Sequence, residues 1–247
     1  MTLTIVLSFP SFVLGQDNDL PVVKESEQIR KAVKRLFGER YQVISIKQSG
    51  VKNILEVRIN NELVYFNSEV THMFIEGQLI QLVDGKNLTE ERKKEFLSIE
   101  FRELPFEKAI VTDFSDSPGK IREIAVFEDP NCGFCRKFRK TLSGIENLRV
   151  YTFLYPILGE NSIEISKNVW CSENPSQVWD DLMLNNVVPE KMDEKLCQFN
   201  LENFLEIGRT LGIEATPTAF LSNGERLTGA ISDESLREKL AVISGEK

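Results

Sequence analysis

The sequence feature that most restricts the fold is the motif Cys-Gly-Phe-Cys at residues 132–135, which places two thiols one helical turn apart. An apolar, strand-like segment at 124–127 precedes it, and Phe138 and Leu142 follow at helical spacing. The pattern predicts a strand, a short connection and a helix whose N-cap is Asn131. The first sulfur would then lie at a helix N-terminus, where unpaired backbone N–H groups and the helix dipole favour an anion.

A thiol at such a position loses its proton more easily than a free thiol, and the thiolate is the species that attacks disulfides. We therefore predict a catalytic pair, in which Cys132 attacks and Cys135 releases the mixed disulfide. Basic residues follow the motif and either add a positive field near the first sulfur or form a solvated helix face; they are Arg136, Lys137, Arg139 and Lys140. The solvated face is favoured for the last two, and Arg136 has the better case for acting on the sulfur.

The composition excludes some classes of protein. With 247 residues, of which 41% are hydrophobic, the chain can form one large or two ordinary domains with real cores. Its formal charge of −8 argues against a nucleic-acid partner. The sequence contains no run of about 18 or more apolar residues, so no membrane-spanning helix is predicted.

Residues 1–16 are predicted to be a signal peptide, which implies export. The segment 3–14 is apolar and short, and residues 13–15 before Gln16 resemble a signal cleavage site. The usual basic region is missing, because no Lys or Arg precedes Lys24. The even number of four cysteines fits an oxidising compartment better than a reducing one, so we expect export.

The segment 17–86 is predicted to be a small α+β domain. A helix capped by Ser26 and ended by Gly38 is followed by short runs rich in Val, Ile, Tyr and Phe at 41–47, 53–59, 62–67, 72–76 and 78–83. Residues 60–61, both Asn, are a credible two-residue hairpin turn. So small a sheet leaves edges and apolar surface uncovered, which makes this domain a candidate for dimerisation.

A charged linker helix is predicted for residues 87–105, with Asn87 or Thr89 at its start, helical character to about Glu103 and Pro105 at its end. The segment 106–247 then reads as strand, helix and strand, a helical stretch from 161 to about 203, a further helix to Leu211, a hairpin and a final helix. This is the order of a thioredoxin-like α/β domain with a helical insertion.

Two further features extend the motif. Thr216 and Pro217 precede an apolar strand, and in thioredoxin-like folds a cis-proline at this position faces the active-site sulfurs. Cys171 and Cys197 could close a loop of about 27 residues and stabilise the fold by roughly 3–4 kcal/mol. The alternative is a zinc site built from all four cysteines, but such sites normally repeat the short spacing twice. The only histidine, His72, lies in the other domain, so a Cys–His hydrolase is disfavoured.

The chain resembles the DsbC/DsbG family of periplasmic protein disulfide isomerases over nearly its full length after the leader. The resemblance is carried by the sequences at 127–135, 169–171, 215–218 and 221–224. It implies an α+β protein with an N-terminal cystatin-like dimerisation domain, a linker helix and a C-terminal thioredoxin-like domain. It also implies a homodimer, a structural disulfide between Cys171 and Cys197, and a DsbD-type membrane reductase as electron donor. No cofactor or metal is expected.

The sequence departs from the family pattern near the motif. Phe134 replaces the family's common Tyr, and Arg136 stands where some members carry His, so the thiol pKa could differ. Thioredoxin itself buries an acidic residue six positions before the first Cys, and Val126 occupies that place here. Proton transfer would then use Glu128, a water molecule or no assisting group.

The expected function is thiol–disulfide interchange, which isomerises or reduces non-native disulfides in exported, misoxidised proteins in the periplasm. The catalytic residues would be Cys132 and Cys135, and the substrate-binding residues would be Gly133, Phe134, Thr216 and Pro217. Two alternatives remain open within the periplasm: a chaperone with little redox turnover and a DsbG-like reductase that protects single cysteines. A DsbA-like oxidase is disfavoured because it lacks the N-terminal domain, and a cytosolic thiol reductase would have free Cys171 and Cys197.

Overall fold

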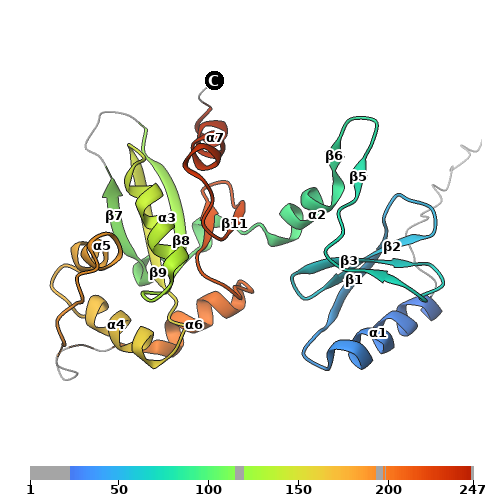
Figure 1. The fold of residues 1–247 in the computed structure, drawn as a ribbon, viewed down its shortest axis with the longest axis horizontal. Coiled ribbons are helices and arrows are strands. Elements are labelled where there is room, and N and C mark those ends of the chain that lie inside the picture. The colour runs from blue at the N-terminus through green and yellow to red at the C-terminus, as the bar shows by residue number, and fades with distance from the viewer. Residues whose placement is uncertain (1–22, 115–119, 193–196, 198, 246–247) are drawn as a thin grey trace, which may run out of the picture. The chain divides into compact units, whose positions relative to one another are not determined.

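The computed structural model describes residues 23–114, 120–192, 197 and 199–245 (Figure 1). The signal peptide expected at 1–16 therefore lies outside the described residues. The chain divides into two compact units, Met1–Lys93 and Lys94–Lys247. In the parts of both units that the structure describes, no helix is long and apolar enough to cross a bilayer.

The N-terminal unit is a helix packed on an antiparallel sheet, as expected. Helix α1 (Val23–Phe37) contributes Ile29 and Val33 to a buried cluster with the sheet. The sheet has the order β1-β2-β3-β4, with β1 (Val43–Gln48), β2 (Ile54–Ile59), β3 (Glu62–Asn67) and β4 (Met73–Phe74). The Asn turn is confirmed, because β2 and β3 are joined by residues 60–61 and Asn60 has a φ of 50°.

Two details of this unit differ from expectation. Helix α1 begins at Val23, so Ser26 lies inside the helix rather than at its cap. The strand expected at 78–83 is only β5 (Ile80–Gln81), which forms a separate hairpin with β6 (Lys86–Asn87).

Helix α2 (Leu88–Leu97) crosses the division between the two units. Asn87 caps it as predicted, because its Oδ1 accepts from the backbone N–H of Glu90 at 3.1 Å. The helix ends at Leu97 rather than near residue 103, and the 3₁₀ turns Phe101–Glu103 and Phe106–Lys108 follow. It ends there because the Ile99 N–H bonds the carbonyl of Gly224 at 3.1 Å in the second unit.

The C-terminal unit is built on a five-stranded sheet with the order β11-β10-β8-β9-β7. The central strands β8 (Arg122–Glu128) and β9 (Leu148–Leu154) are parallel, and the other pairs are antiparallel. The outer strands are β7 (Ile110–Phe114), β10 (Thr218–Leu221) and β11 (Arg226–Thr228). Strand β7 was not predicted.

Five helices complete this unit: α3 (Gly133–Ser143), α4 (Glu160–Trp170), α5 (Pro175–Asn185), α6 (Leu201–Thr210) and α7 (Asp233–Ser244). The helical stretch expected from 161 to 203 is interrupted, since α4 ends at Trp170 and α5 ends at Asn185. Helices α4, α5 and α6 are inserted between β9 and β10, and Figure 1 shows α3 lying over the sheet.

Side chains alternate along a strand, so the central strand β8 contributes to a buried cluster on each face of the sheet. On β8, Ile124 and Val126 pack in one cluster with α3 and α7. Ala125 and Phe127 point to the opposite face and pack with Phe101 in another cluster. The end of β8 is therefore held between two cores, which fixes where the following motif begins.

Candidate active site

The motif lies where β8 gives way to α3. Cys132 is the N-cap of α3, and its Sγ accepts a hydrogen bond from the backbone N–H of Cys135 at 3.2 Å. Asn131, predicted to be the cap, lies one residue too early: its side chain instead donates to Asn161 and Ser162 at 2.9 Å each. Sulfur therefore replaces the usual oxygen as acceptor at the N-terminus of this helix.

The Thr216–Pro217 segment lies beside the first sulfur. The peptide bond is cis, and the Cys132 thiol donates to the carbonyl of Thr216 at 3.3 Å. Sheet register explains this contact: Thr218 of β10 pairs with Phe127 of β8. The residues just before β10 consequently reach past the end of β8, where the motif stands.

The second cysteine is enclosed. Cys135 is fully buried, and its cluster includes Cys132, Leu154 and Trp179. Burial raises the pKa of the Cys135 thiol, and the negative charge of Glu128 raises this pKa further. Both thiols are free and buried, but Cys132 lies at the N-cap of α3, whereas Cys135 lies inside the helix and is fully enclosed.

A buried ionic network lies behind the motif. Glu128 and Arg139 are both fully buried, with Oε2 of Glu128 3.9 Å from the Arg139 guanidinium. The indole N–H of Trp179 donates to the same Oε2 at 3.1 Å. Burial raises the pKa of Glu128 to about 7, although the Arg139 charge and the Trp179 hydrogen bond oppose the rise.

The solvated helix face expected for Arg139 is therefore wrong. Its guanidinium donates to Asp180 at 2.7 Å, to Thr152 at 3.0 Å and to Thr112 at 2.8 Å. These partners come from α5, β9 and β7. The arginine is buried because three different elements satisfy its donors.

A second buried carboxylate holds the loop that carries Cys132. Asp129 accepts from the backbone N–H of Asn131 and from the hydroxyl of Ser162, both at 2.8 Å, and from the backbone N–H of Leu158 at 2.9 Å. Arg136 donates to the carbonyl of Pro130 in the same loop at 3.0 Å. The guanidinium of Arg136 thus binds the backbone of this loop, and its expected action on the sulfur stays a prediction.

Two residues inside the motif face outward. Gly133 is exposed, and the Phe134 side chain is 67% exposed. Leu158, whose backbone N–H bonds Asp129, is also exposed at 58%. The surroundings of the thiol pair therefore include apolar side chains that other protein chains can reach.

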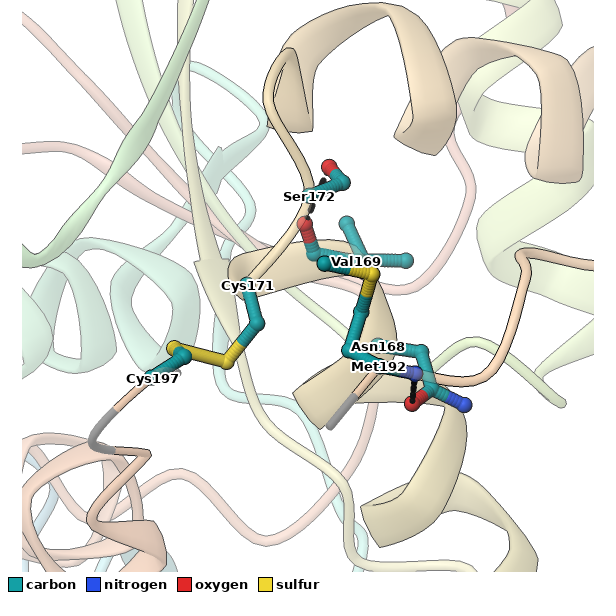
Figure 2. The surroundings of a disulfide bond; sticks show 6 residues. All are labelled: Asn168, Val169, Cys171, Ser172, Met192 and Cys197. Atoms are coloured by element: carbon teal, nitrogen blue, oxygen red, sulfur yellow. Dashed lines mark hydrogen bonds between the residues drawn. A yellow bond between two sulfur atoms is a disulfide. The ribbon is translucent and has the colours of Figure 1, made fainter. Parts of the chain in front are cut away.

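Cys171 and Cys197 are joined by a disulfide with a Cα–Cα distance of 5.6 Å (Figure 2). Cys171 ends α4 as its C-cap. In Figure 2 the side chain of Asn168 accepts from the backbone N–H of Met192 at 3.1 Å, which fixes the loop after α5 beside α4. Among the described residues, no group of three His, Cys, Asp or Glu residues is arranged to hold a metal ion.

Sequence reasoning missed how the insertion contributes to the site. It did not anticipate that Trp179 and Asp180 would bond to Glu128 and Arg139. One signal was available: Arg139 lies four residues after the buried Cys135, so both occupy one helix face.

Comparisons with known proteins agree with this architecture. A family model for a thioredoxin-like domain matches residues 116–243, and one for the disulfide bond isomerase protein N-terminal domain matches residues 21–90. A crystal structure of a disulfide interchange protein from Neisseria gonorrhoeae covers 58% of this chain and 99% of its own. Its TM-score is 0.51 at 24% sequence identity, so it supports the fold alone.

Curated relatives extend the similarity across both units. The "probable thiol:disulfide interchange protein DsbC" of Bordetella parapertussis is 35% identical over 212 residues, which cover 85% of this chain and 73% of the relative. The "thiol:disulfide interchange protein DsbC" of Escherichia coli K12 is 22% identical over 247 residues, covering 97% and 94%. The chain therefore belongs to the DsbC family.

Proposed function

We propose that this protein catalyses thiol–disulfide interchange, isomerising or reducing non-native disulfides in exported proteins through Cys132 and Cys135. One observation carries the proposal: the Cys132 sulfur caps α3, accepts the Cys135 N–H and lies 3.3 Å from the carbonyl of Thr216. Backbone N–H groups at a helix N-terminus favour an anion, and the thiolate is the form of a cysteine that attacks disulfides.

The proposed reaction has two steps. The Cys132 thiolate attacks a client disulfide, so that a mixed disulfide forms and the other client sulfur leaves as a thiolate. In reduction, Cys135 then loses its proton and attacks the Cys132 sulfur, which oxidises the pair and frees the second client thiol. In isomerisation, a client thiolate attacks the mixed disulfide instead and leaves Cys132 reduced.

Client chains would bind around the first sulfur. Thr216 and Pro217 are proposed to present backbone to the client, while Gly133 leaves room for it and Phe134 offers an exposed ring. Since Leu158 is also exposed nearby, the same surface supports contact with apolar segments of unfolded chains. The Cys171–Cys197 bridge is proposed to be structural, because it ties the insertion together.

The N-terminal domain is proposed to join two copies of the chain into a homodimer. The proposed limits are 17–86 for this domain, 87–105 for the linker and 106–247 for the catalytic domain. Exposed apolar side chains of the first unit support this assembly: Phe74, Ile75, Ile80, Leu82 and Val83. We further propose a signal peptide at 1–16, a periplasmic location and a DsbD-type membrane reductase as electron donor, with no cofactor or metal.

Refolding of a scrambled, multi-disulfide protein tests the central proposal. The purified protein should restore native pairing, and Cys132→Ser should abolish this activity. Cys135→Ser should accumulate covalent complexes with clients, seen on non-reducing gels. If no trapped species forms with the second variant, the assigned roles are wrong.

Chaperone activity is the second candidate, favoured by the exposed apolar side chains of Phe134 inside the motif and of Leu158. It predicts that alkylation of the thiols leaves the suppression of client aggregation intact. A DsbG-like reductase would instead act on single oxidised cysteines while showing little recovery of scrambled proteins. The same preparations distinguish the three activities.

A further inference from the structure

A carboxylate oxygen is buried without a partner next to the active-site helix. Glu128 is fully buried at the end of β8, and its Oε2 receives the Trp179 indole N–H and faces Arg139. Its other oxygen, Oε1, is buried and accepts no hydrogen bond. Buried acceptors without partners are costly and rare, so this oxygen requires an explanation.

Glu128 lies on the face of β8 that is covered by α3, the helix that carries the second thiol. Side chains alternate along β8, so Glu128 points to the same face as Ile124 and Val126, which pack against α3. Cys135 lies on that helix, one turn before Arg139, the cation that faces Glu128. Trp179 belongs to the buried cluster of Cys135 and also bonds Glu128, so one side chain links the two groups.

We propose that Glu128 takes the proton from the Cys135 thiol when the mixed disulfide is resolved, and that its free oxygen Oε1 is the acceptor. The inference rests on the Cys132 and Cys135 chemistry proposed above. Burial raises the pKa of Cys135, so this thiol needs a proton acceptor inside the core. With a pKa of about 7, Glu128 is suited both to accept a proton and to return it near neutral pH.

The proton and electron balance is complete. The Cys135 S–H proton moves to Glu128, the Cys135 sulfur bonds the Cys132 sulfur, and the bond between Cys132 and the client sulfur breaks. The client sulfur leaves as a thiolate and gains a proton from water. The client is thereby reduced and the active-site pair oxidised, and the protonated Glu128 returns its proton when the pair is reduced again.

The charges around Glu128 predict in which direction its pKa should move when one of them is removed. Arg139 on α3 lowers the pKa of Glu128, whereas the charge of Asp180 on α5 raises it. The other titratable groups nearby are the two thiols, and the Sγ of Cys132 accepts a hydrogen bond from the backbone N–H of Cys135. The remaining partners of Arg139, Thr112 and Thr152, are neutral. Asp180→Asn should therefore make Glu128 a stronger acid without changing Glu128 itself.

A stopped-flow experiment on the reduced full chain separates the two chemical steps. With dithiobis(nitrobenzoate), attack by Cys132 releases one coloured thiolate, and resolution by Cys135 releases a second. In the wild-type protein the second rate should rise with pH through an inflection near 7, the pKa of Glu128. In Glu128→Gln this inflection should vanish and the second rate should fall at least about tenfold near neutral pH.

Two further variants make the result specific. Glu123→Gln is a matched control, because Glu123 lies on β8 but bonds Arg102 and Tyr151 instead; it should leave the second rate unchanged. Asp180→Asn should shift the inflection to lower pH, which a purely structural effect would not do. If circular dichroism shows that Glu128→Gln is unfolded, the shift of the inflection in Asp180→Asn tests the role of Glu128 instead.

The outcomes separate the two proposals. An unchanged second rate in Glu128→Gln, or an unmoved inflection in Asp180→Asn, overturns the role of Glu128. If the wild-type protein releases no first thiolate, or releases it equally after Cys132→Ser, the proposed function itself is wrong.

Discussion

Replacing Glu128 with Gln should stabilise the second unit relative to the parent protein, and this gain should be larger at pH 8 than at pH 5. The fully buried carboxyl has a pKa of about 7, against 4.5 for a free glutamate. Between these values the folded state binds more protons than the unfolded state, so stability falls as pH rises and levels off above 7. Each pKa unit corresponds to about 1.4 kcal/mol, so ionised Glu128 costs the folded state roughly 3 kcal/mol.

The amide cannot ionise, so this pH-dependent loss should be absent from the variant. In the parent protein, roughly 2–3 kcal/mol of the stability lost through ionisation of Glu128 should be lost between pH 5 and pH 8. The free energy of unfolding of the variant minus that of its parent should increase by this amount across the interval. Trp179 can still donate to the amide oxygen, so the packing is conserved.

Urea titration followed by tryptophan fluorescence measures the difference. Both tryptophans, Trp170 and Trp179, lie in the second unit, so the signal reports on that unit. Parent and variant should both carry Cys132→Ser and Cys135→Ser, so that no active-site thiol titrates and no reductant threatens the remaining disulfide. A stability difference that is the same at pH 5 and pH 8 would refute the assignment of a raised pKa to Glu128.

Three other changes should produce measurable losses. Arg139→Met should lower the free energy of unfolding of the second unit by about 3–5 kcal/mol, because it leaves Glu128 and Asp180 without their counter-charge. Urea titration should show a smaller loss for Arg139→Lys, which keeps the positive charge. Replacing both Cys171 and Cys197 with Ala should cost roughly 3–4 kcal/mol by releasing their loop, which calorimetry would detect; an unchanged melting temperature would contradict it. Gly208→Ala should destabilise by about 1–3 kcal/mol, because a Cβ there would lie 2.2 Å from the Tyr155 ring, whereas Gly144→Ala, whose nearest contact would be 3.5 Å, serves as a control in the same denaturation assay.

The elements that could be predicted from sequence are those with strong local signals. The thiol motif, the strand before it and the apolar stripe of α3 all lie within one short stretch of chain. Asn87 at the start of α2 and the Asn turn at 60–61 could also be predicted, because each depends on neighbouring residues only.

The remaining features depend on tertiary contacts, which local patterns do not reveal. Strand β7 forms by pairing at the sheet edge with β9, and only Ile110 and Thr112 of its five residues are buried. Arg139 looked like a surface residue beside other basic residues, yet partners from three elements draw it into the core. Helix α2 stops at Leu97 because of a hydrogen bond to a distant turn at Gly224.

Asp129 has a consequence for anyone who would shorten or exchange the helical insertion. Its carboxylate joins the turn before Cys132 to Ser162, the second residue after the start of α4, and to the strand-to-helix connection at Leu158. Removing these helices would therefore also release the turn before Cys132, which fixes the position of the reactive sulfur. An insertion transplanted from a homologue would have to bring its own serine to meet this aspartate.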